Sequence, residues 1–363
     1  MNKADLTMKK KAFSVLLLKW NKEQNTREMP WKGEKDPYKI WLSEIILQQT
    51  RVEQGLVYYN NFINTFPDID KLAKAPESTI FKLWEGLGYY TRCRNLIATA
   101  RYISTELKGK FPSSYDEILA LKGVGPYTAA AISSFAYNLP YAVLDGNVFR
   151  VLSRVFGIDT AIDSTEGKKM FTGLANELLE LKQPGLYNQA IMDFGAMLCK
   201  PAAPLCGVCV FKKICVAFLQ NKISKLPAKE KKITIRKRWF YYLVLEYNNK
   251  IAIRQRTEKD IWQDLYEFPL IEGEKVQRTR SVLEQAGKEG WLLKNNYEVI
   301  QSSALFEQKL SHQLIAGVFI TLKMKKKPLF KKEVIWLTRK ELKKYSFPRI
   351  INKNFILEKA GKN

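Results

Sequence analysis

Residues 121–150 read LKGVGPYTAAAISSFAYNLPYAVLDGNVFR, and two features of this stretch decide how the first part of the chain folds. The segment KGVGP, residues 122–126, is a tight glycine turn between two apolar segments of helical composition. Backbone amides at a helix N-terminus bind phosphate oxygens, and glycine allows the close approach and the positive φ that such a turn needs. Gly123, Val124 and Gly125 therefore predict a helix–hairpin–helix clamp on DNA phosphates. An ordinary turn between two helices is the alternative.

The second feature is Asp145, which stands where the N-cap of the next helix should be and is followed by Gly146 and Asn147. An N-cap carboxylate accepts backbone amides and lies at the positive end of the helix dipole, and both effects favour ionisation. We expect Asp145 to be held anionic, so that it can stabilise a developing cation. A purely structural cap is the alternative.

A second carboxylate stands upstream, in the segment YKIWLSEIILQQT at residues 38–50. Asp36 and Pro37 give this segment a strong helix start. If apolar neighbours desolvate Glu44, its pKa rises and it can act as a general acid near neutral pH. Two carboxylates whose pKa values move in opposite directions are typical of enzymes that cleave glycosidic bonds. Alternatively, Glu44 lies on a narrow polar face of the helix.

The length and charge of the chain favour two domains and an acidic partner. The 363 residues carry a formal net charge of +24, and nucleic acid is the leading candidate partner. Residues 1–220 hold 28 lysines and arginines against 21 acidic residues, whereas residues 221–363 hold 32 against 15. The single histidine, His312, disfavours catalytic triads built on histidine. No apolar run is long enough to span a membrane and no signal peptide is recognisable, so we expect a cytoplasmic, nucleoid-associated protein without a membrane partner.

The periodicity of the sequence changes near residue 238. Before that point no strand-like alternation occurs, which predicts an all-α first domain over residues 1–216. Residues 217–237 form a basic, proline-bearing linker, and residues 238–350 predict an α+β domain whose first hairpin turns at Asn248-Asn249. Residues 351–363 form a basic tail.

Four of the five cysteines lie close together in the sequence. Cys199, Cys206, Cys209 and Cys215 have the spacing C-x6-C-x2-C-x5-C. Four thiolates this close indicate a tetrahedral zinc ion or an iron–sulfur cluster, and their number does not decide between the two.

Together, these motifs resemble the endonuclease III-like base-excision DNA glycosylases, and most closely the MutY adenine DNA glycosylases. The cysteine spacing is similar to that superfamily's [4Fe–4S] loop, LKGVGPYTA to its helix–hairpin–helix, and LDGNV to its catalytic aspartate segment. The resemblance covers residues 14–220 strongly and residues 238–350 more weakly. It implies a mainly α fold, in which a helix–hairpin–helix glycosylase domain precedes an α+β MutT-like (Nudix-fold) domain that recognises 8-oxoguanine.

The resemblance also implies roles for individual residues. Bifunctional relatives carry a lysine nucleophile where this chain has Tyr127, so a Schiff-base step has no obvious agent here. Glu44 would protonate N7 of adenine, and Asp145 would stabilise the sugar oxocarbenium ion. Tyr127 and Asn147 would position these two carboxylates.

Further residues match DNA-contacting positions of the family. Trp31, Lys32 and Gln189 match positions that line the adenine pocket, with Lys32 in place of an arginine found in many members. Residues beside the opposite strand would be Gln49, Thr50, Leu87, Gly88 and Tyr89. Ser311 and His312 match the loop that recognises 8-oxoguanine, although Leu310 replaces its phenylalanine. Residues 274–296 lack the glutamate-rich box of a Mg²⁺-dependent Nudix hydrolase.

The implied function is a monofunctional adenine DNA glycosylase of base excision repair with a [4Fe–4S] cluster. Its partner would be duplex DNA containing adenine opposite 8-oxoguanine or guanine, and it would act as a monomer. Two alternatives remain at this point: a bifunctional endonuclease III-like pyrimidine-damage glycosylase and AP lyase, and a non-catalytic DNA-binding protein of the same fold.

Overall fold

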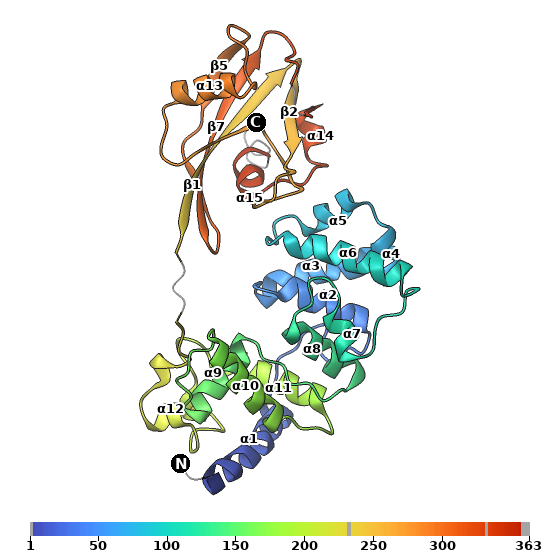
Figure 1. Ribbon diagram of the computed structural model, residues 1–363, viewed down its shortest axis with the longest axis vertical. Coiled ribbons are helices and arrows are strands. Elements are labelled where there is room, and N and C mark those ends of the chain that lie inside the picture. Colours follow the sequence, from blue (N-terminus) through green and yellow to red (C-terminus); the bar gives the residue numbers. More distant parts are fainter. Residues whose placement is uncertain (1–2, 231–233, 331–332, 357–363) are drawn as a thin grey trace. The chain divides into compact units, whose positions relative to one another are not determined.

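The computed structural model describes residues 3–230, 234–330 and 333–356, and the chain divides into two compact units (Figure 1). Unit 1 comprises Met1–Lys74 with Arg94–Lys232, and unit 2 comprises Ala75–Cys93 with Ile233–Asn363. Residues 357–363 of the predicted basic tail lie outside the described residues.

Unit 1 is helical throughout its described part. Its elements are α1 (Lys3–Gln24), α2 (Pro37–Leu47), α3 (Val52–Thr65), α4 (Ile69–Lys74), most of α6 (Thr91–Thr105), α7 (Tyr115–Leu119), α8 (Pro126–Tyr137), α9 (Gly146–Phe156), α10 (Thr165–Leu178), α11 (Pro184–Met197), the 3₁₀ turns η1 (Cys206–Val208) and η2 (Ile223–Lys225), and α12 (Val216–Leu219). Across all described residues, no helix combines the length and apolar composition needed to cross a bilayer.

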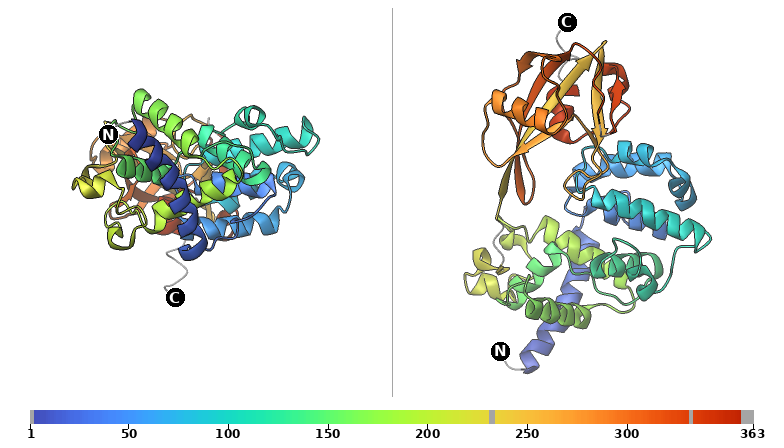
Figure 2. Two further views of the ribbon diagram at one scale, coloured as in Figure 1. Left: turned by 90° about the horizontal axis from the view of Figure 1, so that it is seen from below. Right: turned by 45° about the horizontal axis from the view of Figure 1, so that its top comes forward.

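One hydrophobic core of unit 1 joins α1 to α9, α10 and α11. The blue ribbon of α1 runs beside green helices of this unit (Figure 2). Phe13, Leu17 and Trp20 are spaced along one face of α1 and are fully buried there. The ring of Phe13 stacks on Phe211 at 4.5 Å between centroids, and Trp20 meets Phe194 edge-on at 5.0 Å. These contacts hold α11, which carries part of the candidate site, against the rest of the unit.

Unit 2 is built on a mixed sheet. Its elements are α5 (Glu77–Trp84), β1 (Arg236–Tyr247), β2 (Lys250–Gln255), β3 (Tyr266–Glu267), β4 (Leu270–Gly273), α13 (Thr279–Lys288), β5 (Tyr297–Ser302), β6 (Phe306–Lys309), β7 (Gln313–Met324), β8 (Ile335–Leu337), α14 (Arg339–Leu342), α15 (Arg349–Ile351) and the π-helical turn η3 (Asn352–Ile356).

The order of the paired strands is β3-β2-β1-β7-β5, with β4 on β1, β6 on β7 and β8 on β2. The long strands β1 and β7 run parallel, and β1 and β2 form an antiparallel hairpin. Asn248 and Asn249 make its turn with φ values of 45° and 59°, a left-handed conformation that asparagine tolerates well. The predicted hairpin is therefore confirmed. One face of the sheet packs against α13 through Val282 and Ala286.

The predicted fold class is confirmed: a helical first part precedes an α+β second part, and among the described residues no strand occurs before Arg236. The predicted linker, residues 217–237, begins with residues that pack in unit 1, because Ala217 and Leu226 are buried in its core. Residues 75–93 group with unit 2. The exact domain boundaries stay a prediction.

Candidate active site

A hollow of about 470 Å³ opens in unit 1 where the end of α2 meets the starts of α8 and α9 and one face of α11. The sequence analysis selected eight of the residues that line it: Trp31, Glu44, Gln49, Thr50, Tyr127, Asp145, Asn147 and Gln189. The other lining residues are Arg27, Met29, Leu47, Gln48, Val52, Gly146 and Met192. Glu44 and Asp145 are about a hundred residues apart in sequence and share this hollow.

Helix α2 carries Glu44 into the hollow. The helix begins where the Asp36 side chain accepts a hydrogen bond from the Tyr38 amide at 2.9 Å. Glu44 is 6% exposed, so the alternative of a solvated polar face does not hold. Burial raises the pKa of Glu44 from its usual 4.5 to about 7; a hydrogen bond from Tyr127 opposes the shift, and the charge of Asp145 adds to it. Glu44 can therefore carry a proton near neutral pH.

Asp145 caps α9 as predicted. Its Oδ1 accepts hydrogen bonds from the amides of Asn147 at 2.9 Å and Val148 at 2.8 Å, and its Oδ2 accepts one from Asn147 Nδ2 at 2.7 Å. The predicted direction of its pKa shift is wrong. Burial of the carboxyl raises the pKa of Asp145 and outweighs these hydrogen bonds and the nearby Arg150, which lower it. Both carboxyls of the site therefore have raised pKa values.

Arg150 holds the amide oxygen of Asn147, the end of the side chain that does not contact Asp145. Its guanidinium donates to Asn147 Oδ1 at 2.9 Å, to the Gly195 carbonyl at 2.8 Å and to the Cys199 carbonyl at 2.6 Å. Because Asn147 Oδ1 is held by Arg150, its Nδ2 is directed at Asp145. The asparagine thus orients the carboxylate, and Arg150 orients the asparagine.

Tyr127 lies in the first turn of α8, where its side chain hydrogen-bonds to Glu44 and is close enough to Asp145 to feel its charge. Burial raises the pKa of Tyr127 well above its usual 10, and the charges of Glu44 and Asp145 raise it further. Tyr127 is therefore a hydrogen-bond donor and not a nucleophile in this site. Its hydroxyl also lies 4.0 Å from Met192 Sδ.

Trp31 and Gln189 line the same hollow as Glu44. Trp31 is 9% exposed, and its ring meets Tyr59 edge-on at 5.2 Å. The resemblance places Lys32 in the same lining, but Lys32 does not line this hollow. Its amine lies 3.2 Å from Asp193 Oδ2 and donates to the Arg27 carbonyl at 2.7 Å.

Gln49 and Thr50 follow the end of α2 at the mouth of the hollow. Gln49 has a φ of 55°, and the Thr50 amide bonds to the Leu47 carbonyl at 3.0 Å. This tight reversal brings both side chains to the hollow that holds Glu44.

The glycine turn lies between α7 and α8. Gly123 has a φ of 82°, and a Cβ there would lie 2.7 Å from the Asn95 side chain, so only glycine fits. Gly125 is the N-cap of α8 with a φ of −104°, so the predicted positive φ holds for Gly123 alone. A Cβ on Gly125 would meet open space, which leaves the first turn of α8 accessible to a ligand.

The remaining predicted DNA contacts lie in unit 2. Leu87 is 6% exposed, Gly88 has a φ of 81°, and Tyr89 is exposed with a φ of 50°. Ser311 and His312 form the exposed turn between β6 and β7. The Tyr89 hydroxyl and the Ser311 hydroxyl are hydrogen-bonded, so the structure brings two of these predicted residues together.

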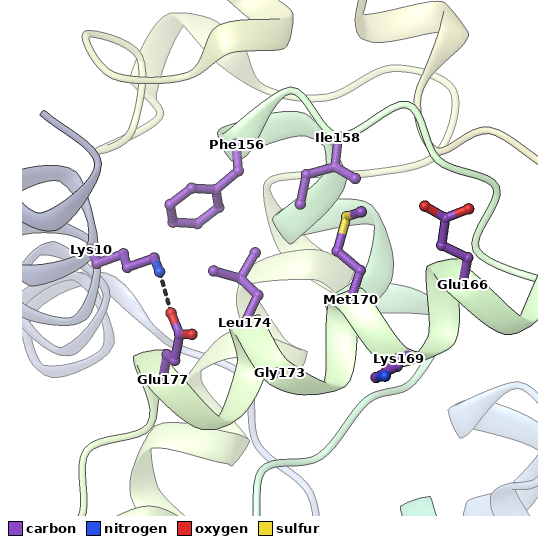
Figure 3. Close-up of a pocket in the computed structure, with 9 residues that line it drawn as sticks. All are labelled: Lys10, Phe156, Ile158, Glu166, Lys169, Met170, Gly173, Leu174 and Glu177. Atoms are coloured by element: carbon purple, nitrogen blue, oxygen red, sulfur yellow. Dashed lines mark hydrogen bonds and ion pairs between the residues drawn. The ribbon is translucent and has the colours of Figure 1, made fainter. Parts of the chain in front are cut away.

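A second hollow of unit 1, of about 540 Å³, has different chemistry (Figure 3). Phe156, Ile158 and Leu174 form an apolar lining, and the ion pair between Lys10 and Glu177 lies at its edge. It contains no predicted site residue, and of the two carboxyls that line it, Glu166 and Glu177, the second is paired with Lys10.

The four cysteines are free, and Cys215 is buried. Burial raises the pKa of Cys209 to about 12, and charges on Cys199, Cys215 and Cys206 would raise it further, so these thiols lie near one another. Backbone amides and Arg154, which donates to Cys199 Sγ at 3.6 Å, favour thiolates. This donor set fits a thiolate-bound cluster. Among the described residues, however, no three His, Cys, Asp or Glu side chains stand in metal-binding geometry.

Sequence reasoning missed Arg27, Arg150 and Asp193. The signal for Asp193 is a lone acid four residues after Gln189 in the apolar run of α11, which places the two on one helix face. For Arg27 and Arg150 no local pattern distinguishes these cations from solvated ones.

Comparison with known proteins defines the class. Residues 42–177 match the model of the HhH-GPD superfamily of base excision DNA repair proteins, and residues 240–356 match the NUDIX domain. A solved structure described as a thermostable thymine-DNA glycosylase has a TM-score of 0.55 and 30% identity; the match covers 59% of this chain and 99% of that one. Unit 1 thus has the fold of a helix–hairpin–helix DNA glycosylase.

Two relatives define the family. An adenine DNA glycosylase of Buchnera aphidicola subsp. Baizongia pistaciae is 38% identical over 303 residues, 83% of either chain. That of Buchnera aphidicola subsp. Acyrthosiphon pisum is 32% identical over 361 residues, 98% of this chain and 99% of the relative. The chain belongs to the adenine DNA glycosylase family, glycosidases of N-glycosyl bonds, and the family prediction is confirmed. Endonuclease III-like and MutY proteins generally carry a [4Fe–4S] cluster.

Proposed function

We propose that this protein hydrolyses the N-glycosidic bond of adenine opposite 8-oxoguanine or guanine in duplex DNA and leaves the strand uncut. The observation that carries the proposal is the hollow that joins Glu44, Tyr127 and Asp145. It combines a carboxyl that is protonated near neutral pH, a second carboxyl beside it and a wall of polar and aromatic side chains. The relatives are adenine DNA glycosylases, which agrees with adenine as the base.

Glu44 is the general acid. The target base cannot reach a buried carboxyl while it is stacked in the duplex, so the adenine nucleotide turns out of the helix into the hollow. With a pKa of about 7, Glu44 is protonated in about half of the molecules at pH 7. It gives its proton to N7 of adenine, which makes the base a better leaving group.

Asp145 stabilises the sugar as the base departs. An oxocarbenium-like transition state carries positive charge, and a nearby carboxylate favours it electrostatically. The hydrogen bonds from Asn147 and Val148 fix the orientation of the Asp145 carboxylate before the reaction begins. Water then adds to the sugar carbon and releases one proton to solvent, and an abasic site remains.

Tyr127 accounts for the absence of strand cleavage. A lyase step requires an amine that forms a Schiff base with the sugar. Tyr127 occupies the position of that amine and stays protonated. Lys32 follows the lining residue Trp31 in the sequence, but its amine contacts Asp193 and donates to the Arg27 carbonyl.

The proposal includes a [4Fe–4S] cluster bound by Cys199, Cys206, Cys209 and Cys215. Bound there, it would cross-link the thiolates of a loop that has little secondary structure of its own. Arg150 donates to the Cys199 carbonyl and Arg154 to the Lys200 carbonyl, so α9 and this loop support each other.

We assign recognition of the base opposite adenine to residues of unit 2 and to Gln49, and phosphate binding to the glycine turn. Ser311 and His312 would contact 8-oxoguanine, Tyr89 and Gln49 would enter the opposite strand, and the Gly123–Gly125 turn would bind phosphate. The partner is duplex DNA with an A:8-oxoguanine or A:G mispair, bound by a monomer in the cytoplasmic nucleoid.

A glycosylase assay tests the proposal. Duplexes pairing adenine with 8-oxoguanine, guanine, cytosine or thymine are incubated with the protein, and abasic sites are revealed with alkali. We expect release opposite 8-oxoguanine and guanine, with strand breaks only after alkali. Strand cleavage without alkali, together with a covalent complex trapped by borohydride, would instead indicate a lyase. Release at equal rates from all four duplexes would contradict the assigned mispair preference.

Two variants test the roles of the carboxyls. Glu44→Gln and Asp145→Asn should each lower the single-turnover rate by about 10²-fold or more. Glu53, an exposed acid of α3, provides the matched control, because Glu53→Gln removes one negative charge outside the hollow. Unchanged rates in both site variants would refute the assignment.

A further inference from the structure

Asp193 is a fully buried carboxylate that neither the family comparison nor the resemblance assigns to any role. It lies on α11, and its side chain has no exposed surface. A buried carboxylate is costly unless charges and hydrogen bonds satisfy it. Four side chains converge on it: Arg27, Lys32, Asn25 and Gln189.

The four partners divide between the two oxygens. Oδ1 accepts from Arg27 NH1 and from Gln189 Nε2, each at 2.9 Å. Oδ2 accepts from Asn25 Nδ2 at 2.9 Å and lies 3.2 Å from Lys32 Nζ. Each Asp193 oxygen therefore acts as a hydrogen-bond acceptor, facing one cationic side chain and one amide nitrogen.

This restriction determines which way the Gln189 amide points. Gln189 lies one helical turn before Asp193, on the same face of α11, and it lines the hollow with Glu44. A glutamine amide has a donor end and an acceptor end of nearly the same shape. Because Asp193 binds one N–H of Nε2 and so fixes that end of the amide, Oε1 is the acceptor that Gln189 has left for a molecule in the hollow.

We propose that Asp193 is a positioning residue that makes the pocket wall selective for a purine with an amino group at C6. Through Gln189 it presents an acceptor to the base, which a 6-amino group satisfies and a 6-oxo group does not. The inference rests on the proposed function and deepens it, because it names the group that separates adenine from hypoxanthine. Without Asp193, Gln189 could turn either end to the base.

The test compares three bases opposite 8-oxoguanine: adenine, hypoxanthine and unsubstituted purine, which has neither donor nor acceptor at C6. Single-turnover rates are measured for the wild type and for Asp193→Ala. The three bases differ in how readily they leave the sugar. We therefore take the ratio of the adenine rate to the rate on each other base, and compare that ratio between wild type and variant. We expect Asp193→Ala to lower the adenine-to-hypoxanthine ratio by about tenfold or more, the effect of one hydrogen bond to a buried group.

A second variant separates positioning from structural support. Glutamate at position 189 has an acceptor at both ends and needs no orientation. Gln189→Glu in the Asp193→Ala background should therefore restore the preference for adenine. It also keeps one negative charge beside Arg27 and Lys32, so it folds even if Asp193→Ala alone does not. Asn25→Ala is the matched control: it removes a hydrogen bond to Asp193 without touching Gln189, and the ratio should not change.

The outcomes are distinct. A ratio that falls in Asp193→Ala and recovers in the double variant supports the proposal. Equal losses on all three bases, or a double variant without adenine preference, overturn it and leave Asp193 a structural residue. If the wild type releases no adenine, the proposed function itself fails, and that result is visible before any variant is made.

Discussion

Replacing Glu44 by glutamine should stabilise the folded protein at alkaline pH although it lowers the rate of catalysis. Glu44 is buried, and burial raises its pKa from 4.5 to about 7. A group whose pKa is higher in the folded state binds its proton more tightly there than in the unfolded chain. Its contribution to stability is fully present below pH 4.5 and is lost as the pH rises through 7. Glutamine has the same shape and never ionises.

The size of this stability difference follows from the pKa shift of Glu44. A change from 4.5 to about 7, at 1.36 kcal/mol for each pKa unit, corresponds to about 3 kcal/mol. The free energy of unfolding of the wild type should therefore fall, relative to Glu44→Gln, by about 3 kcal/mol in total between acid pH and pH 8.5. About 2 kcal/mol of this difference should develop between pH 5.5 and 8.5. For a domain of this size, 2 kcal/mol corresponds to roughly 4–8 °C in Tm.

Thermal unfolding of the wild type and Glu44→Gln at pH 5.5, 7.0 and 8.5 measures this difference. Glu53→Gln, which removes an exposed charge from the same unit, controls for the change in net charge. The reasoning fails if the gap between wild type and Glu44→Gln is the same at all three pH values, or if it narrows as the pH rises. Either result would mean that Glu44 is not desolvated in the folded protein.

Three further predictions test other parts of the site. Because only protonated Glu44 acts, the single-turnover rate should fall about tenfold per pH unit well above pH 7. The hydrogen bond from Tyr127 lowers the pKa of Glu44, so Tyr127→Phe should move this fall in rate to higher pH. A pH–rate profile of both proteins measures the two effects. Gly123→Ala should cost about 1–2 kcal/mol or more because φ is 82° there, whereas Gly125→Ala should leave the thermal stability almost unchanged and weaken DNA binding, measured by fluorescence anisotropy. The purified protein should be brown with on the order of four iron atoms per chain, and Cys209→Ser should lower the iron content in elemental analysis; a colourless zinc protein would contradict the cluster.

Much of the site could be predicted because its signals are local in sequence. Asp36 and Asp145 act on backbone within three residues of themselves, and the positive φ of Gly123 is a property of its own turn, so these positions follow from the pattern around them. The hairpin at Asn248 is local in the same sense. Such features depend on short-range sterics and hydrogen bonds, which every helix start or tight turn obeys in the same way.

The residues that sequence reasoning missed act over long range. Asp193 meets Arg27 and Lys32, more than 150 residues earlier in the chain, and nothing near Arg27 in sequence indicates a buried partner. Lys32 matches a position of the adenine pocket, but the position of its amine depends on this distant carboxylate. A resemblance transfers positions along the chain, whereas the direction of a side chain is set by partners that the motif does not include.

Asp145 combines a local feature that the sequence predicts with a long-range feature that it does not. Its cap hydrogen bonds follow from the sequence, but burial of its carboxyl depends on α2, α8 and α11 closing around it, and that desolvation reverses the expected direction of its pKa shift. The two carboxyls still differ, although both pKa values are raised. Asp145 accepts two backbone amides and the Asn147 side chain, all of which favour its anion, and the charge of that anion raises the pKa of Glu44 further. A proton entering the site is therefore stabilised on Glu44. The acid and the anion are distinguished by their hydrogen-bond donors and not by opposite pKa shifts.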